Sequence, residues 1–101
     1  MHLVQILLPL YDNAGAPLPR ALYDRVREEL TRRFGGLTAF MRAPGEGHWR
    51  NEGETKRDDI VVFEVMTENL DLAWWHAYRR ELEQGFRQEA IVIRSQDIQV
   101  L

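Results

Sequence analysis

The sequence predicts an α+β fold in which two helices cover one face of a four-stranded antiparallel sheet. Four segments have the period-two alternation or the β-branched and aromatic content that is typical of strands. Two others carry an apolar residue at every fourth position, as amphipathic helices do. The order along the chain is strand, helix, strand, strand, helix, strand. Right-handed connections then place both helices on the same face of the sheet, which is the ferredoxin-like βαββαβ arrangement.

The four strands are expected at His2 to Leu10, Leu37 to Arg42, Ile60 to Met66 and Glu89 to Ser95. The first alternates around a continuous apolar set at its even positions. The third is rich in Val and Phe. The last alternates around Ile91 and Ile93.

The helices are expected over residues 18–34 and 70–88. Pro19 fits the first turn of the first helix, where a missing N–H costs nothing, and Gly35-Gly36 provides a left-handed cap at its end. Asn69 or Thr67 is a candidate cap for the second helix. The two apolar stripes consist of Leu18, Leu22, Val26, Leu30 and Phe34, and of Leu70, Trp74, Tyr78, Leu82 and Phe86. Trp74 is therefore expected in the core, and Trp75 and His76 off the stripe.

The long connection between the second and third strands, residues 43–59, is too long for a tight hairpin and contains several glycines. We expect a flanking ribbon formed by His48 to Asn51 and Thr55 to Asp58, joined by a turn at residues 51–54. Long loops of this kind often carry functional residues.

The composition is that of a single globular domain over residues 1–101, with 45% apolar and 29% charged residues. The net charge of −3 argues against general nucleic-acid binding. Without cysteine, the chain has no disulfide, no thiolate nucleophile and no thiolate-ligated zinc. The first ten residues lack a basic region, and Pro9 ends the apolar run early, so we expect no secretory leader, no membrane association and a cytoplasmic location.

The alternation of the strands assigns their residues to two faces. The fully apolar face, suited to the helices, consists of Val4, Ile6, Leu8, Leu37, Ala39, Met41, Val61, Phe63, Val65, Ile91 and Ile93. The opposite face, called the open face below, consists of Leu3, Gln5, Leu7, Thr38, Phe40, Arg42, Ile60, Val62, Glu64, Val92 and Arg94. Its apolar residues would form a large patch in a monomer. We expect a face-to-face homodimer to cover it, the alternative being a monomer with a solvated face.

Glu64 interrupts an otherwise apolar strand, where a charge is costly unless it is paired or used. With Gln5, Arg42 and Arg94 on the same face, it is our first candidate for a general acid or base, and the arginines are candidates for orienting an anionic group. The alternative is a structural carboxylate that pairs with Arg42 or Arg94 and fixes the register.

His48, Trp49 and Arg50 form a second candidate group in the long connection. His48 could carry a proton near neutral pH, Trp49 could cover a ligand, and Arg50 could hold a carboxylate or phosphate at two points. The alternative is that Trp49 only packs against the end of the sheet or a dimer seam.

Metal and cofactor sites are not predicted. The three histidines are not spaced as converging ligands, and a metal site needs three or four of them. The segment Gly45-Glu46-Gly47 lacks the third glycine of a phosphate-binding loop and does not open a helix.

Several short motifs resemble a family of bacterial domains of unknown function with a ferredoxin-like fold. They are Arg33-Phe34-Gly35-Gly36-Leu37-Thr38, Gly47-His48-Trp49-Arg50, Gly53, Tyr78-Arg79 and Phe86-Arg87-Gln88-Glu89-Ala90. More widely, the chain is similar in fold to the dimeric α/β-barrel superfamily, which includes cofactor-free monooxygenases and small isomerases. The resemblance is at the level of the fold, and it brings no reaction and no catalytic residues.

Two hypotheses follow. In the first, a cofactor-free dimer binds or transforms a small organic molecule in a cavity at the open face, with Glu64 or His48 as the acid or base. In the second, the open face and the long connection serve only dimerisation or docking of a partner protein. Whether the chain is an enzyme stays open at this point.

Overall fold

The computed structural model describes residues 1–42 and 60–101, without the side chains of residues 39–42. It contains two helices and an antiparallel sheet, which confirms the predicted α+β class. In chain order the elements are β1 (His2–Pro9), α1 (Arg20–Phe34), β2 (Thr38–Arg42), β3 (Ile60–Thr67), α2 (Leu72–Gly85) and β4 (Val92–Asp97). The predicted ribbon at residues 48–51 and 55–58 lies outside the described residues.

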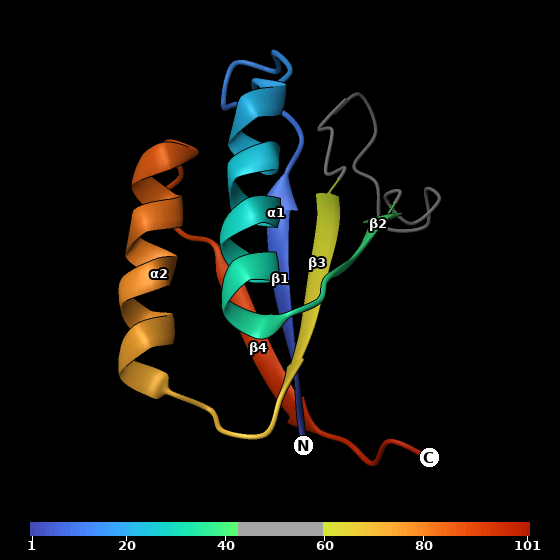
Figure 1. The fold of residues 1–101 in the computed structure, drawn as a ribbon. Helices are drawn as coiled ribbons and strands as arrows, with labels where there is room; N and C mark the ends of the chain where they lie inside the picture. The colour runs from blue at the N-terminus through green and yellow to red at the C-terminus, as the bar shows by residue number, and fades with distance from the viewer. Residues whose placement is uncertain (43–59) are drawn as a thin grey trace, which may run out of the picture.

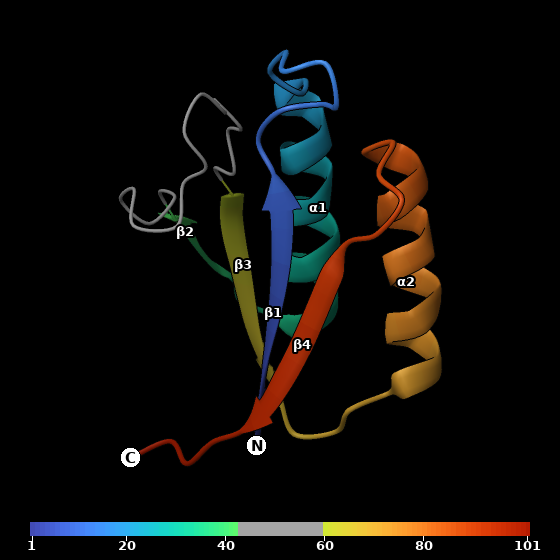
Figure 2. The same ribbon diagram turned by 180° about the vertical axis from the view of Figure 1, so that it is seen from behind.

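The centre of the sheet is β1, which pairs antiparallel with β3 on one side and β4 on the other. The backbone of β2 runs antiparallel beside β3, at the edge of the sheet. Both helices lie on one face (Figure 1). Seen from behind, β3, β1 and β4 have no described helix over them (Figure 2).

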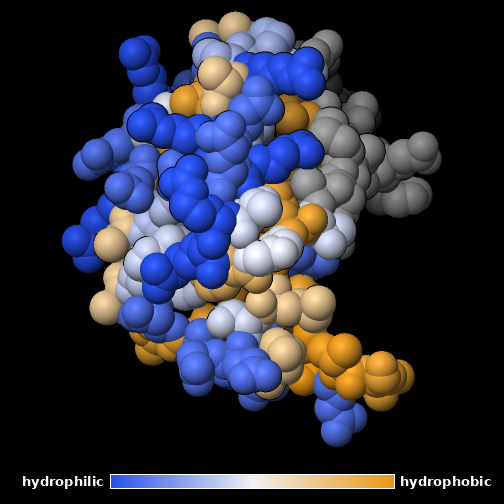
Figure 3. Space-filling view, in the orientation of Figure 1, coloured by the Kyte–Doolittle hydropathy of each residue, from blue (hydrophilic) through white to orange (hydrophobic). Residues whose placement is uncertain are grey.

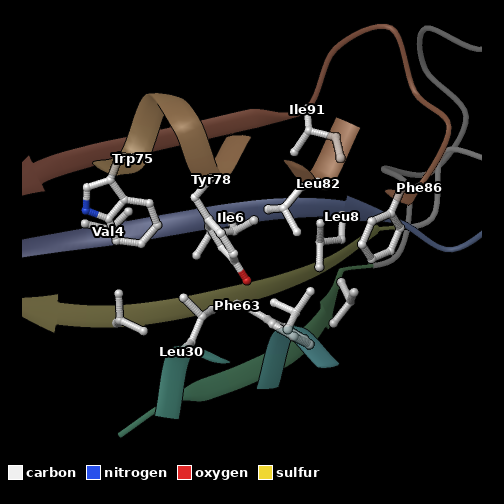
Figure 4. Packing of buried hydrophobic residues seen from close by; sticks show 13 residues of the cluster. Val4, Ile6, Leu8, Leu30, Phe63, Trp75, Tyr78, Leu82, Phe86 and Ile91 are labelled. Carbon is white, nitrogen blue, oxygen red and sulfur yellow. The ribbon is translucent and has the colours of Figure 1, made fainter. Parts of the chain in front are cut away.

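The core lies between the helices and the face that the sequence assigns to them. Val4, Ile6 and Leu8 of β1 are at most 1% exposed, and Phe63 of β3 is fully buried (Figure 4). Because even-numbered residues of β1 face the helices, its odd-numbered residues face the open side. The assignment is confirmed for Val4, Ile6, Leu8, Val61, Phe63, Val65 and Ile91, all of which are buried.

Helix α1 begins two residues later than predicted. Pro19 has φ −59° and ψ 137°, so it is the extended residue before the first turn and not part of that turn. The predicted C-terminal cap is confirmed. Gly35 has φ 76°, and its N–H donates to the carbonyl oxygen of Thr31 at 2.8 Å. A residue with a side chain is strained in this left-handed conformation.

Helix α2 is capped by Asp71, whose carboxylate accepts a hydrogen bond from the N–H of Trp74 at 3.1 Å. The prediction of Asn69 or Thr67 as the cap is wrong. The Thr67 hydroxyl instead donates to the carbonyl oxygen of Asn69 at 2.9 Å and stabilises the turn before the helix.

The buried stripe of α2 differs from the predicted one at its first turn. Trp75, Tyr78, Leu82 and Phe86 are buried, whereas Trp74 is only partly buried. The observed spacing of three, four and four residues follows a helix of 3.6 residues per turn, and a strict spacing of four drifts off the buried face. Trp74 lies at the edge of the core.

Helix α2 ends at Gly85, three residues earlier than predicted, because Arg87 adopts φ 53°. The N–H of Gln88 then donates back to the carbonyl oxygen of Glu83 at 2.9 Å, and the N–H of Ile91 donates to the Glu83 carboxylate at 3.0 Å. The latter bond ties the chain to the helix, so β4 begins at Val92 and not at Glu89.

The position of the two tryptophans gives a stability test. Trp75→Ala should cost about 3–5 kcal/mol of unfolding free energy, because it opens a cavity in the core. Trp74→Ala should cost about 1–2 kcal/mol, because its side chain keeps partial access to solvent. Urea unfolding of both variants measures the difference. An equal cost in the two variants, or a larger cost for Trp74→Ala, would instead support the predicted apolar stripe that contains Trp74.

Candidate functional site

Three of the predicted site residues lie side by side across the open face. Gln5 of β1 stands opposite Glu64 of β3 and opposite Arg94 of β4 in the strand registers. The Gln5 side-chain Nε2 donates to Glu64 Oε2 at 2.6 Å, and Arg94 Nε donates to Gln5 Oε1 at 2.8 Å. We call these three residues the polar row.

The polar row is charged with opposite sign at its two ends. Both donors point the same way along it, from the Arg94 guanidinium through the Gln5 amide to the Glu64 carboxylate. Hydrogen bonds to charged groups are about twice as strong as neutral ones. The structural alternative expected a direct pair between Glu64 and an arginine such as Arg94. Instead, the side chain of Gln5 links Glu64 to Arg94.

Hydrogen-bonding capacity is left over at both ends of the polar row. Arg94 is exposed and Glu64 is half-buried. Among the side chains that the structure describes, those of residues 1–38 and 60–101, no other one hydrogen-bonds to the terminal nitrogens of Arg94 or to Glu64 Oε1. The row is consequently able to bind further polar groups.

Apolar residues flank the polar row along the strands. On one side, Leu3 stands opposite Met66. On the other side, Leu7 stands between Val62 and Val92. Met66 is 53% and Val92 54% exposed. A polar strip between two apolar strips is typical of small-molecule sites, which are mostly apolar with a few placed polar groups.

At Val62, the open face is less exposed than the sequence suggested. Val62 is only 1% exposed in the single chain, and Leu3, Leu7 and Ile60 are half-buried. Val62 is a short residue on an inner strand, opposite Leu7 in the register. Among the described side chains of this face, the exposed apolar surface is concentrated at Met66 and Val92.

The remaining predicted residues do not join the polar row within the described part of the chain. Thr38, and not Arg42, stands opposite Glu64, and Arg42 stands opposite Ile60. Four residues of strand separate the Arg42 position from the Thr38 position by about 13 Å. His48, Trp49 and Arg50 lie outside the described residues, so their roles stay predictions.

A groove between the two helices is a second feature of the structure, which the sequence did not reveal. It has a volume of about 410 Å³, and its lining includes Leu22, Glu29, Tyr78 and Phe86. The phenol oxygen of Tyr78 is buried and lies beside the Glu29 carboxylate, without a well-aligned hydrogen bond to any described residue. Burial first, and then the negative charges of Glu29 and Glu81, raise the pKa of Tyr78 above its ordinary value.

An aromatic cluster joins the C-terminal end of α1 to the start of α2. The Arg33 guanidinium lies 4.1 Å from the ring centre of Trp74, and its terminal nitrogen lies 3.8 Å from the carboxylate of Asp71. Phe34 stacks on Trp75 with the ring centres 5.3 Å apart. These contacts hold the helices together, which explains the Arg33-Phe34 pair without a ligand.

The two histidines among the described residues lie on different elements. His2 Nδ1 lies 2.8 Å from an Asp97 carboxylate oxygen at the end of the sheet, and His76 is exposed on α2. The described residues contain no group of three or more metal-ligating side chains. Among the same residues, no helix is both long and apolar enough to cross a membrane. The helix layer presents mostly hydrophilic residues to solvent (Figure 3).

Comparison with known proteins supports the fold. The chain is similar to a phage SAM lyase solved in complex with S-methyl-5'-thioadenosine, with a TM-score of 0.59 and 16% identity over 95% of this chain and 80% of that one. At this identity the similarity shows a shared fold alone. No family model matches the chain, and no curated protein matches it. The resemblance predicted from the motifs is thus supported at the level of fold, without a matching family.

The buried phenol of Tyr78 gives a prediction about alkaline pH. Because the folded state binds this proton more tightly than the unfolded state, the free energy of unfolding should fall as pH rises above about 10. Tyr78→Phe should weaken that decline. At pH 7 it should leave stability unchanged or raise it by about 1 kcal/mol, because it removes a buried hydroxyl without a well-aligned hydrogen bond to any described residue.

Tyr23→Phe is the matched control, because the Tyr23 hydroxyl donates to the carbonyl oxygen of Pro9. Its loss should cost about 1 kcal/mol at pH 7. Thermal unfolding between pH 7 and pH 11 measures both variants. A Tyr78→Phe variant as destabilised as Tyr23→Phe would show that the Tyr78 hydroxyl has a partner.

Proposed function

We propose that this chain is a cytoplasmic bacterial ferredoxin-like domain that binds a small organic molecule at its open face, between the two subunits of a homodimer and without a cofactor. The polar row carries this proposal. Three polar side chains from three strands form a hydrogen-bonded line, with a cation at one end and an anion at the other.

The chemistry of the row favours a ligand with two kinds of polar group. The free oxygen of Glu64 suits a hydroxyl or amino donor, and the terminal nitrogens of Arg94 suit a carboxylate, phosphate or carbonyl acceptor. The flanking residues Leu3, Leu7 and Val92 suit an apolar or aromatic ring between them. Nucleosides combine these features, because carboxylates hydrogen-bond ribose hydroxyls and the base supplies a flat apolar surface.

The comparison structure suggests a first compound to test. Its ligand, S-methyl-5'-thioadenosine, is a nucleoside with two ribose hydroxyls and an apolar thioether. If a reaction occurs in this chain, Glu64 is its acid or base within hydrogen-bonding reach of the ligand. We propose His48 as a second proton carrier, and Arg42, Trp49 and Arg50 as further ligand-binding residues.

A non-catalytic interaction domain is the second candidate function. It is favoured by the exposure of Met66 and Val92, because two large apolar side chains on one face suit contact with another protein surface. In this alternative the polar row only fixes how the two surfaces align.

Titration calorimetry with S-methyl-5'-thioadenosine tests the small-molecule proposal. The wild-type protein should bind it, and Glu64→Gln should bind it about tenfold or more weakly, because a hydrogen bond to a charged group contributes about 1.5–3 kcal/mol. Gln84→Glu, on the exposed surface of α2, is the control and should bind as the wild type does. Equal binding by Glu64→Gln, or none by the wild type, would favour the interaction domain.

Sedimentation tests the homodimer. The wild-type chain of 11.9 kDa should sediment as a dimer at micromolar concentration. Val92→Lys should separate it into monomers, because the ammonium would be buried without a partner. Leu72→Lys is the matched control on α2, where the leucine is 59% exposed but lies on the helix side. A wild-type monomer, or a dimer that Leu72→Lys breaks equally, would contradict the open-face interface.

A further inference from the structure

The direction of the polar row restricts how two copies can pair. Gln5 stands on the central strand, with Glu64 one strand away on β3 and Arg94 one strand away on β4. Reading across the sheet, the row is negative, neutral and positive. The order of charges therefore has a direction across the sheet. A twofold axis that relates two sheets packed face to face either reverses this direction in the partner or preserves it.

A face-to-face dimer has a twofold axis that lies between the two sheets. If the axis runs along β1, it exchanges the β3 side with the β4 side, so Glu64 faces the partner's Arg94 and Gln5 faces the partner's Gln5. If the axis runs across the strands, Glu64 faces the partner's Glu64 and Arg94 faces the partner's Arg94. Like charges placed opposite each other repel and weaken association. The polar row selects the first axis.

The apolar residues do not decide between the two axes. The axis along β1 places Leu7 opposite the partner's Leu7 and the exposed Met66 opposite the partner's Gln96, by the registers that join β1 to β3 and β4. The axis across the strands places Leu7 opposite the partner's Leu3. The charges of the polar row alone select the arrangement.

We propose that the site is composite: Glu64 of one subunit and the partner's Arg94 form one binding site, and each dimer holds two such sites related by the axis. This inference rests on the proposed homodimer. Within one chain, two strand spacings of about 4.8 Å put the Cα atoms of Glu64 and Arg94 about 9.6 Å apart, with Gln5 between them. Sheets stacked face to face lie about 10 Å apart, so Glu64 and the partner's Arg94 are separated by a similar distance, but no side chain of the row stands between them and a small ligand can contact both.

Charge reversal tests the pairing in solution. In Glu64→Arg alone, two arginines meet at each site, and in Arg94→Glu alone, two glutamates meet. Each variant should therefore dimerise about tenfold or more weakly than the wild type. An equimolar mixture should form a heterodimer of nearly wild-type affinity, because both sites then hold one Arg and one Glu. Sedimentation of each variant and of the mixture measures this.

The outcomes separate this inference from the proposed function. A wild-type dimer whose two variants are weakened but do not rescue each other overturns the composite site and leaves the homodimer standing. Variants that remain full dimers alone overturn it as well. A monomeric wild-type protein overturns both proposals.

A second measurement avoids reversed charges, which could disturb folding at the half-buried Glu64. The chain has no cysteine, so Glu64→Cys and Arg94→Cys each introduce a unique thiol. A short bis-maleimide should cross-link the two variants to each other in a mixture, and each variant poorly to itself. Efficient self-cross-linking of Glu64→Cys would instead place the axis across the strands and contradict the proposal.

Discussion

The arrangement of this protein depends on the pairing of β1 with both of its neighbours. The even-numbered residues Val4, Ile6 and Leu8 are held against the helices by the core, so the strand cannot shift by one residue without exposing all three. That constraint fixes the odd-numbered residues on the other face. It brings Gln5 between Glu64 and Arg94, which are far apart in the sequence, at hydrogen-bonding distance from both. Burial on one face thereby specifies the polar geometry of the other.

Much of the fold and part of the site followed from residue patterns alone. Alternation along β1 and β3 identified the buried face, and the same alternation placed Gln5, Glu64 and Arg94 together, because strand parity determines the face. The register was not readable from the sequence, and the register decides that Thr38 stands opposite Glu64 in place of Arg42. Trp75 was missed because a spacing of four approximates a helical period only over short stretches. The end of α2 was missed because Arg87 adopts a left-handed conformation that usually signals glycine.

The similarity to the phage lyase shows a shared fold. A fold of this kind hosts many functions, so a ligand is inferred from the open face itself. There, oppositely charged groups joined through Gln5 lie between apolar residues. The helix side has no comparable arrangement among the described residues: its groove is lined by a buried phenol, and its charged residues lie in a solvated surface.

The side-chain amide of Gln5 reports most directly on the central claim, because it lies at the middle of the polar row and at the proposed axis. Its two N–H signals can be followed by NMR while the protein is diluted through the range in which a dimer dissociates. We predict that they shift with concentration, whereas the amide signals of Gln84 on α2 stay constant. Gln5 signals that do not move while the sedimentation shows dissociation would contradict an interface at the open face.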